Sequence, residues 1–152
     1  MKNTEKALKW IVGILESKNV IFQVSGGFAA NLYGSKRELA DIDIDIENNS
    51  FDKILDEVRL FIIFGPNQYI DENWNLKLLT LSYEGQEIDI CGETKIFNKI
   101  YGCWVELKTD FSNSNYLPIY GITIPVIQKA AIVEYKNKLQ REVDLEDIKA
   151  LS

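Results

Sequence analysis

Histidine is absent from the 152-residue sequence. Its absence excludes Ser-His-Asp and Cys-His catalytic arrangements, zinc sites with histidine ligands, and an imidazole acid or base that works near neutral pH. Any catalysis by this chain must therefore use carboxylates, lysines, or a bound metal ion or cofactor.

Cysteine is nearly as scarce, with two residues, Cys91 and Cys103. They are too few for a zinc site and do not form a CxxC pair, so we expect both to fill the core as reduced thiols. The longest apolar run, Leu60–Phe64, has the length of a strand, and no signal-peptide segment is recognisable. These features predict a cytoplasmic protein with no membrane partner.

The charge is acidic, with 17 Lys and Arg against 23 Asp and Glu, which gives a net charge of −6. This balance argues against a sequence-specific nucleic-acid partner, but it does not exclude a local basic groove. The length and the apolar fraction of 46% predict one globular domain spanning residues 1–152.

Hydrophobic periodicity predicts the α+β class, with a mixed β-sheet packed against helices. We expect helices at 4–18, 28–33, from Ser50 to Val58, at 95–100 and 126–139, and from a cap at Asp144 to Leu151. We expect strands at 20–24, 41–46, 60–64, 76–83, 86–91 and 122–124. Gly65-Pro66 should end one strand, Glu84-Gly85 should form a hairpin turn, 112–115 should be a loop, and Pro125 should lie near a helix start.

The segment 41–46 alternates aspartate and isoleucine without exception. As a strand it places Asp41, Asp43 and Asp45 on one face, about 7 Å apart along the chain, where like charges repel. Either this face is a solvated edge, or it binds a divalent ion, since Mg²⁺ prefers carboxylate, water and phosphate oxygens. Asp89, in a second alternating strand, either joins this patch or faces solvent.

Gly26 and Gly27 lie between a predicted strand and a short helix. Glycines in such a turn let backbone N–H groups approach a phosphate, and the helix N-terminus adds a favourable dipole. The carboxylate strand follows one short helix later, so a phosphate site and a metal site are expected side by side, as a triphosphate with Mg²⁺ requires.

The segment Ser25–Gly34 followed by Arg37–Ile44 resembles the signature of the DNA polymerase β-like nucleotidyltransferase superfamily. That signature is a glycine turn, a short helix and Asp-x-Asp, and Asp89 matches its third acidic residue. The length is similar to that of small stand-alone members, the minimal nucleotidyltransferases and the core of the lincosamide and aminoglycoside enzymes. The resemblance implies the minimal nucleotidyltransferase fold with C-terminal helices.

The C-terminal stretch also resembles these proteins, which end in a lysine-rich helix and Arg-x-x-Asp-hydrophobic-x-Asp-hydrophobic. The matching residues are Lys129, Lys136, Lys138, Arg141, Asp144, Asp147 and Leu151. Gly27 and Leu39 depart from the family's Ser and Thr. Asp45 adds a carboxylate, so Asp43 and Asp45 form an alternative pair, although the offset from Arg37 favours Asp41 and Asp43.

The resemblance implies a role for each matching residue. Asp41, Asp43 and Asp89 would be catalytic and would bind two Mg²⁺ ions, with Asp89 also helping to remove a proton from the acceptor hydroxyl. The nucleotide would be bound by Gly26, Gly27, Arg37, Lys136 and Arg141. Arg37 fits a solvent-facing loop position equally well, and surface residues of a helix, such as Lys136 and Arg141, more often have no specific role. We assign no role to the three tryptophans.

The function that follows is metal-dependent transfer of a nucleoside monophosphate from an NTP to an acceptor hydroxyl, with release of pyrophosphate. The acceptor would be a small molecule or a protein. The alternative is a nucleotide-binding or antitoxin-type interaction module that binds the partner protein of a toxin–antitoxin pair with weak or no turnover.

Overall fold

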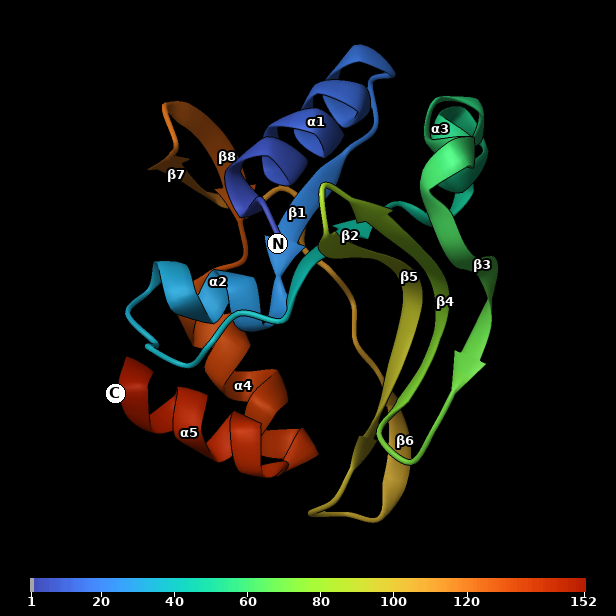
Figure 1. The fold of residues 1–152 in the computed structure, drawn as a ribbon. Coiled ribbons are helices and arrows are strands. Elements are labelled where there is room, and N and C mark those ends of the chain that lie inside the picture. Colours follow the sequence, from blue (N-terminus) through green and yellow to red (C-terminus); the bar gives the residue numbers. More distant parts are fainter. Residues whose placement is uncertain (1) are drawn as a thin grey trace.

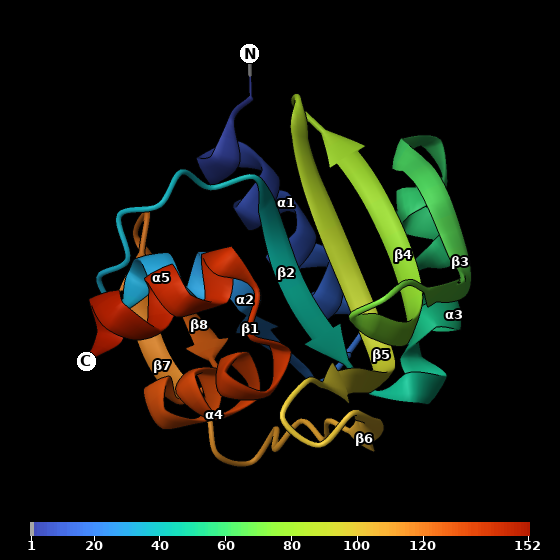
Figure 2. The same ribbon diagram turned by 90° about the horizontal axis from the view of Figure 1, so that it is seen from below.

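Alternating sequences form the centre of the fold, where strand β2 (Asp41–Ile46) pairs in parallel with β5 (Gln86–Asn98). The computed structural model describes residues 2–152, and its mixed sheet has eight strands in the order β3-β4-β5-β2-β1-β8-β7, with β6 also paired to β5. Helices pack around this sheet (Figures 1 and 2). The α+β class with a mixed sheet is therefore confirmed.

The remaining elements follow the chain. The other strands are β1 (Phe22–Ser25), β3 (Ile62–Ile70), β4 (Trp74–Tyr83), β6 (Cys103–Glu106), β7 (Asn115–Ile119) and β8 (Ile122–Val126). The helices are α1 (Thr4–Ser17), α2 (Gly26–Leu32), α3 (Phe51–Val58), α4 (Lys129–Leu139) and α5 (Glu142–Leu151), with short 3₁₀ turns at Asn48–Ser50 and Arg59–Phe61. No helix within residues 2–152 is both long and apolar enough to cross a bilayer.

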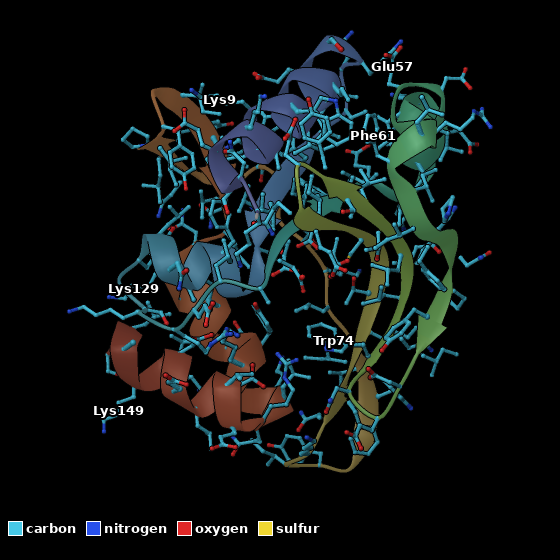
Figure 3. The ribbon with its side chains drawn as sticks, viewed as in Figure 1. Lys9, Glu57, Phe61, Trp74, Lys129 and Lys149 are labelled. Carbon is cyan, nitrogen blue, oxygen red and sulfur yellow. The ribbon has the colours of Figure 1, made fainter. Side chains whose placement is uncertain are left out.

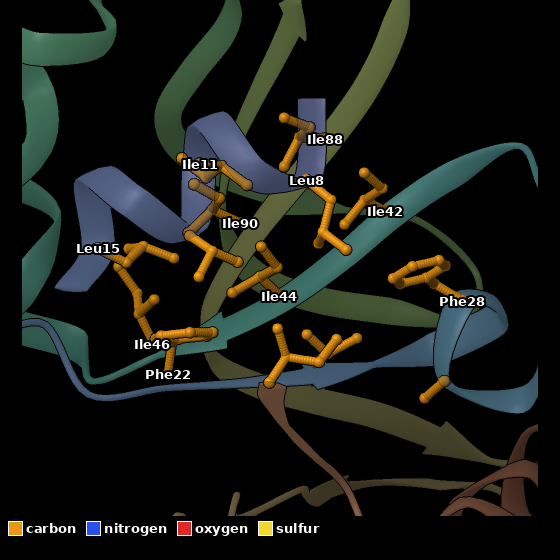
Figure 4. Packing of buried hydrophobic residues seen from close by; sticks show 14 of the residues in the cluster. Leu8, Ile11, Leu15, Phe22, Phe28, Ile42, Ile44, Ile46, Ile88 and Ile90 are labelled. Atoms are coloured by element: carbon orange, nitrogen blue, oxygen red, sulfur yellow. The ribbon is translucent and has the colours of Figure 1, made fainter. Parts of the chain in front are cut away.

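The core lies on the isoleucine face of β2 and β5. Helix α1 packs its apolar stripe, which includes Leu8, Ile11 and Leu15, against this face (Figure 4). The stripe meets Ile44 of β2 and Ile90 of β5, both fully buried. Burial of one side of β2 fixes its register and directs its aspartates to the opposite face.

A second group of helices lies beside that opposite face. Helices α2, α4 and α5 contact one another, and α4 also contacts β5 (Figure 1). Helix α2 is anchored by Phe28, Ala29 and Ala30, all buried. This group forms one wall of the cleft described below.

Several predicted boundaries are wrong, each because a neighbouring strand or a helix start decides the local conformation. The segment 95–100 is not helical, because β5 continues to Asn98 between β4 and β6. Gly65-Pro66 does not end its strand, because β3 is an edge strand whose outer side needs no N–H donor. Strand β6 was not expected.

The C-terminal half needs similar corrections. Pro125 lies within β8, which pairs with β1 and β7, so α4 begins at Lys129 and not at Val126. Strand β7 was not expected, and it begins at Asn115 inside the predicted loop. Asp144 is the third residue of α5 rather than its cap, and its carboxylate accepts the N–H of Arg141, the capping residue.

Three further predictions also differ from the structure. The helix expected at 28–33 begins two residues earlier, so Gly26 and Gly27 form the first turn of α2. Neither cysteine lies in the core: Cys91 is half-buried on the aspartate face of β5, and Cys103 is exposed at the start of β6.

Candidate active site

The parallel pairing of β2 and β5 brings the acidic residues of the two strands to one face of the sheet. Asp43 lies opposite Asp89 in the register, and Asp41 lies opposite Glu87. Because side chains alternate along both strands, these carboxylates share the face opposite the buried isoleucines. They line a cleft with a volume of about 660 Å³.

The glycine turn lies beside Asp43. The backbone N–H of Gly27 donates to Asp43 Oδ2 at 3.2 Å. Gly26 has φ +62°, and a Cβ atom there would overlap the Asp43 carboxylate, so this position requires glycine. Both glycines line the cleft and are half-buried.

The crowding of carboxylates changes their protonation. Desolvation in the cleft, followed by the charges of Asp89, Asp41 and Asp45, raises the pKa of Asp43 to about 8. Desolvation also raises the pKa of Asp89 to about 6, against the hydrogen bond that Thr80 Oγ1 donates to it at 2.8 Å. The site therefore holds more negative charge than its surroundings stabilise, which favours binding of a cation.

Asp45 has a different environment from the other two aspartates of β2. Its partner in the register is Cys91, and the hydroxyls of Ser25 and Thr109 hydrogen-bond to its carboxylate. Desolvation raises the pKa of Asp45 to about 6 in spite of these bonds. The register thus places acidic residues of β5 opposite Asp41 and Asp43 but a cysteine opposite Asp45.

The cationic residues of the cleft are held by two aspartates of α5. Asp147 accepts from Arg37 Nη2 at 2.8 Å and from Arg37 Nε at 3.2 Å. Asp144 accepts from Arg141 Nε at 2.7 Å, and Lys136 Nζ lies 3.1 Å from an oxygen of each aspartate. These five groups, the Asp144–Asp147 cluster below, carry a net charge of +1.

The three cations differ in exposure. The Lys136 side chain is 2% exposed and faces the two aspartates, so its ammonium group is paired inside the cluster. The side chains of Arg37 and Arg141 are 24% and 28% exposed and line the cleft. The two arginines therefore present the positive charge of the cluster to the cleft.

The donor chemistry of the site suits a hard cation. Asp41, Asp43 and Asp89 supply only oxygen atoms, and burial raises the pKa of the neighbouring Cys91 thiol, which keeps it neutral. Among residues 2–152, no three acidic, cysteine or histidine side chains are close enough to hold an ion by themselves. Water and phosphate oxygens would complete the coordination, as is usual for Mg²⁺.

Two residues of the cleft on β4 were not identified from the sequence. Thr80 lies opposite Asp89 in the β4–β5 hairpin, and counting outwards from the turn at Glu84-Gly85 would have found it. Trp74 faces the helices across the cleft, and the Arg141 guanidinium lies 5.3 Å from its ring centroid (Figure 3). No local pattern signals that contact.

Comparison with known proteins supports the fold. No family model and no curated protein matches the sequence. Solved structures do match. One is a provisionally assigned nucleotidyltransferase from Thermotoga maritima, with a TM-score of 0.71 and 21% identity over 98% of this chain and 89% of that one.

Two further solved structures are also similar. The lincosamide antibiotic adenylyltransferase LnuA, solved with lincomycin, has a TM-score of 0.63 and 21% identity over 99% of this chain and 98% of its own. ANT(2")-Ia, solved with adenylyl-2"-tobramycin, has a TM-score of 0.59 and 12% identity over 97% of this chain and 86% of its own. The chain therefore has the nucleotidyltransferase fold.

Proposed function

We propose that this protein transfers a nucleoside monophosphate from an NTP to an acceptor hydroxyl and releases pyrophosphate. The observation that carries the proposal is the register that sets Asp43 opposite Asp89, with the glycine turn in contact with Asp43. The adenylyltransferase fold of the similar structures agrees with it.

Each group of the cleft has a part in this reaction. Asp41 and Asp43 would hold Mg²⁺ on the triphosphate, with Asp89 on the acceptor side. The bound ions would neutralise phosphate charge and activate the acceptor oxygen. Arg37 and Arg141 would bind phosphate oxygens, while Lys136 pairs with Asp144 and Asp147 inside the cluster.

The bonds that change are at the α-phosphorus. The acceptor oxygen forms a bond to this atom, and the bond from the α-phosphorus to the oxygen that bridges to the β-phosphate breaks. Pyrophosphate leaves with that electron pair. Asp89, on the acceptor side, would take the hydroxyl proton.

The turn must adjust when phosphate binds. The Gly27 N–H donates to Asp43 in the free protein, so a phosphate oxygen would have to share or replace that acceptor. A cation bound to the Asp43 carboxylate would neutralise its charge and weaken the hydrogen bond that the Gly27 N–H donates to it. Metal and phosphate binding are therefore expected to be cooperative.

Labelled nucleotides test the proposal. The protein is incubated with each NTP labelled at the α- or γ-phosphate, Mg²⁺ and a cell extract. We expect α-label, and no γ-label, on an acceptor, with pyrophosphate released. The double variant Asp41→Asn/Asp43→Asn, folded by circular dichroism, should label nothing. Tight capture of a partner protein without labelling would support the interaction-module alternative instead.

A further inference from the structure

The buried carboxylate of Asp147 lies one layer behind the cleft and joins three other side chains. It is fully buried and accepts hydrogen bonds from Ser35 Oγ at 2.8 Å and from both Nε and Nη2 of Arg37. Lys136 Nζ completes the set at 3.1 Å. Such bidentate pairing fixes the plane of a guanidinium group, which a single contact does not.

The fixed guanidinium of Arg37 lies against the glycine turn. Its Nη2 atom is 2.8 Å from the place that a Cβ atom of Gly27 would occupy. Asp43 contacts the same residue through the Gly27 N–H. Among residues 2–152, Arg37 Nη1 has no hydrogen-bond partner, and Arg37 lines the cleft. The free edge of the guanidinium is thus available to an anion beside Gly27.

Charge balance explains why Arg37 stays there. Lys136, Asp144 and Asp147 form a buried set with one positive and two negative charges. Among residues 2–152, the two arginines on the cleft side neutralise the surplus negative charge. A buried carboxylate without an ion-pair partner has a high free energy. Pairing with Asp147 therefore keeps the Arg37 side chain in place, although that side chain loses conformational entropy.

We infer that Asp147 is a positioning residue for the triphosphate: it holds the Arg37 guanidinium against the glycine turn so that Nη1 binds a phosphate oxygen. This inference rests on the proposed function, and it assigns the C-terminal helix α5 a part in nucleotide binding. Asp147 itself touches no substrate.

A double-mutant cycle tests the coupling. Calorimetry measures the dissociation constant of inorganic tripolyphosphate with Mg²⁺ for the wild type, Arg37→Ala, Asp147→Asn and the double variant. We expect each single variant to weaken binding about tenfold or more, since a charged hydrogen bond is lost. In the Arg37→Ala background, Asp147→Asn should have less than about a threefold effect, because its effect passes through Arg37.

The cycle with Asp144→Asn and Arg37→Ala is the matched control. Asp144 is equally buried on the same helix and binds Arg141 instead. Its effect on affinity should be the same in both backgrounds. Additive effects of Asp147→Asn and Arg37→Ala would overturn the inference, as they would show that Asp147 acts through general stability.

Arg37→Lys gives a second test that does not depend on folding of the Asp147 variant. Lysine keeps the charge but cannot make the bidentate pair. We expect its affinity to fall nearly as far as that of Arg37→Ala, and wild-type affinity would overturn the inference. If the wild type binds neither Mg²⁺-tripolyphosphate nor any Mg²⁺-NTP, the proposed function itself fails and the inference falls with it.

Discussion

Replacement of Asp43 by asparagine should make the metal-free protein more stable at neutral pH. The carboxylate is half-buried, and the charges of Asp89, Asp41 and Asp45 act on it. Asparagine has nearly the same shape, and its side-chain oxygen can still accept the Gly27 N–H. The substitution therefore removes the charge and keeps the contact.

The magnitude follows from the pKa of Asp43, which rises from 3.8 to about 8. Between these values the folded protein holds a proton that the unfolded chain releases, so stability falls as the pH rises from about 4 to 8. Each pKa unit corresponds to about 1.4 kcal/mol, which sets an upper limit of about 4 kcal/mol at pH 7. Because the carboxylate is open to water in the cleft, we expect a gain of about 1–3 kcal/mol.

Urea unfolding in EDTA, followed by tryptophan fluorescence, measures the gain. Asp43→Asn should exceed the wild type at pH 7.5, and the difference should fall towards zero near pH 4. Glu16→Gln, an exposed carboxylate on α1, is the matched control and should change little. An Asp43→Asn variant that is less stable than the wild type at pH 7.5 would refute the reasoning.

Three further predictions concern the surroundings of the site. Burial alone would raise the pKa of Asp147, but hydrogen bonds from Arg37, Ser35 and Lys136 lower it to about 2. The stabilisation that Asp147 gives the folded protein is therefore complete above about pH 4 and is lost as the pH falls towards 2. In urea unfolding, the difference in unfolding free energy between the wild type and Asp147→Asn should shrink by about 2 kcal/mol between pH 5 and 2. Gly26→Ala should cost about 1–3 kcal/mol in thermal unfolding, since φ is +62° and the new Cβ overlaps Asp43, whereas Gly13→Ala on α1, with open space around it, should stabilise. Thr80→Val removes the hydrogen bond that lowers the pKa of Asp89, so the acidic limb of the transfer rate should move to higher pH, and an unmoved limb would exclude Asp89 as the proton acceptor.

The sequence predicted the aspartate face of β2 and β5 because both strands carry a strong local pattern. Alternation in 41–46 and 86–91 fixed which side of each strand is buried, and the two segments pair as parallel neighbours. The hairpin turn at Glu84-Gly85 was also correct. The alternation and the hairpin turn depend on residues that are close in sequence, whereas the pairing of the two segments does not.

The predictions that differ from the structure concern residues whose conformation or contacts depend on segments distant in sequence. Residues 95–98 are a strand because β4 and β6 flank them, and β6 pairs with them across a turn that has no strong signal. Lys136 was predicted to bind the nucleotide, whereas the structure buries it against Asp144 and Asp147, which follow it by eight and eleven residues. A motif shows that such charges recur together, while only the packing of α4 on α5 shows that they neutralise one another.

Calorimetric titration of each NTP, with Mg²⁺ and with EDTA, tests the central claim most directly. The account predicts that at least one NTP binds the wild type only when Mg²⁺ is present, and that Asp89→Asn and Asp41→Asn/Asp43→Asn each abolish this binding while the proteins stay folded. Equal affinity in the variants, or binding that ignores Mg²⁺, would contradict a shared metal–nucleotide site formed by β2 and β5.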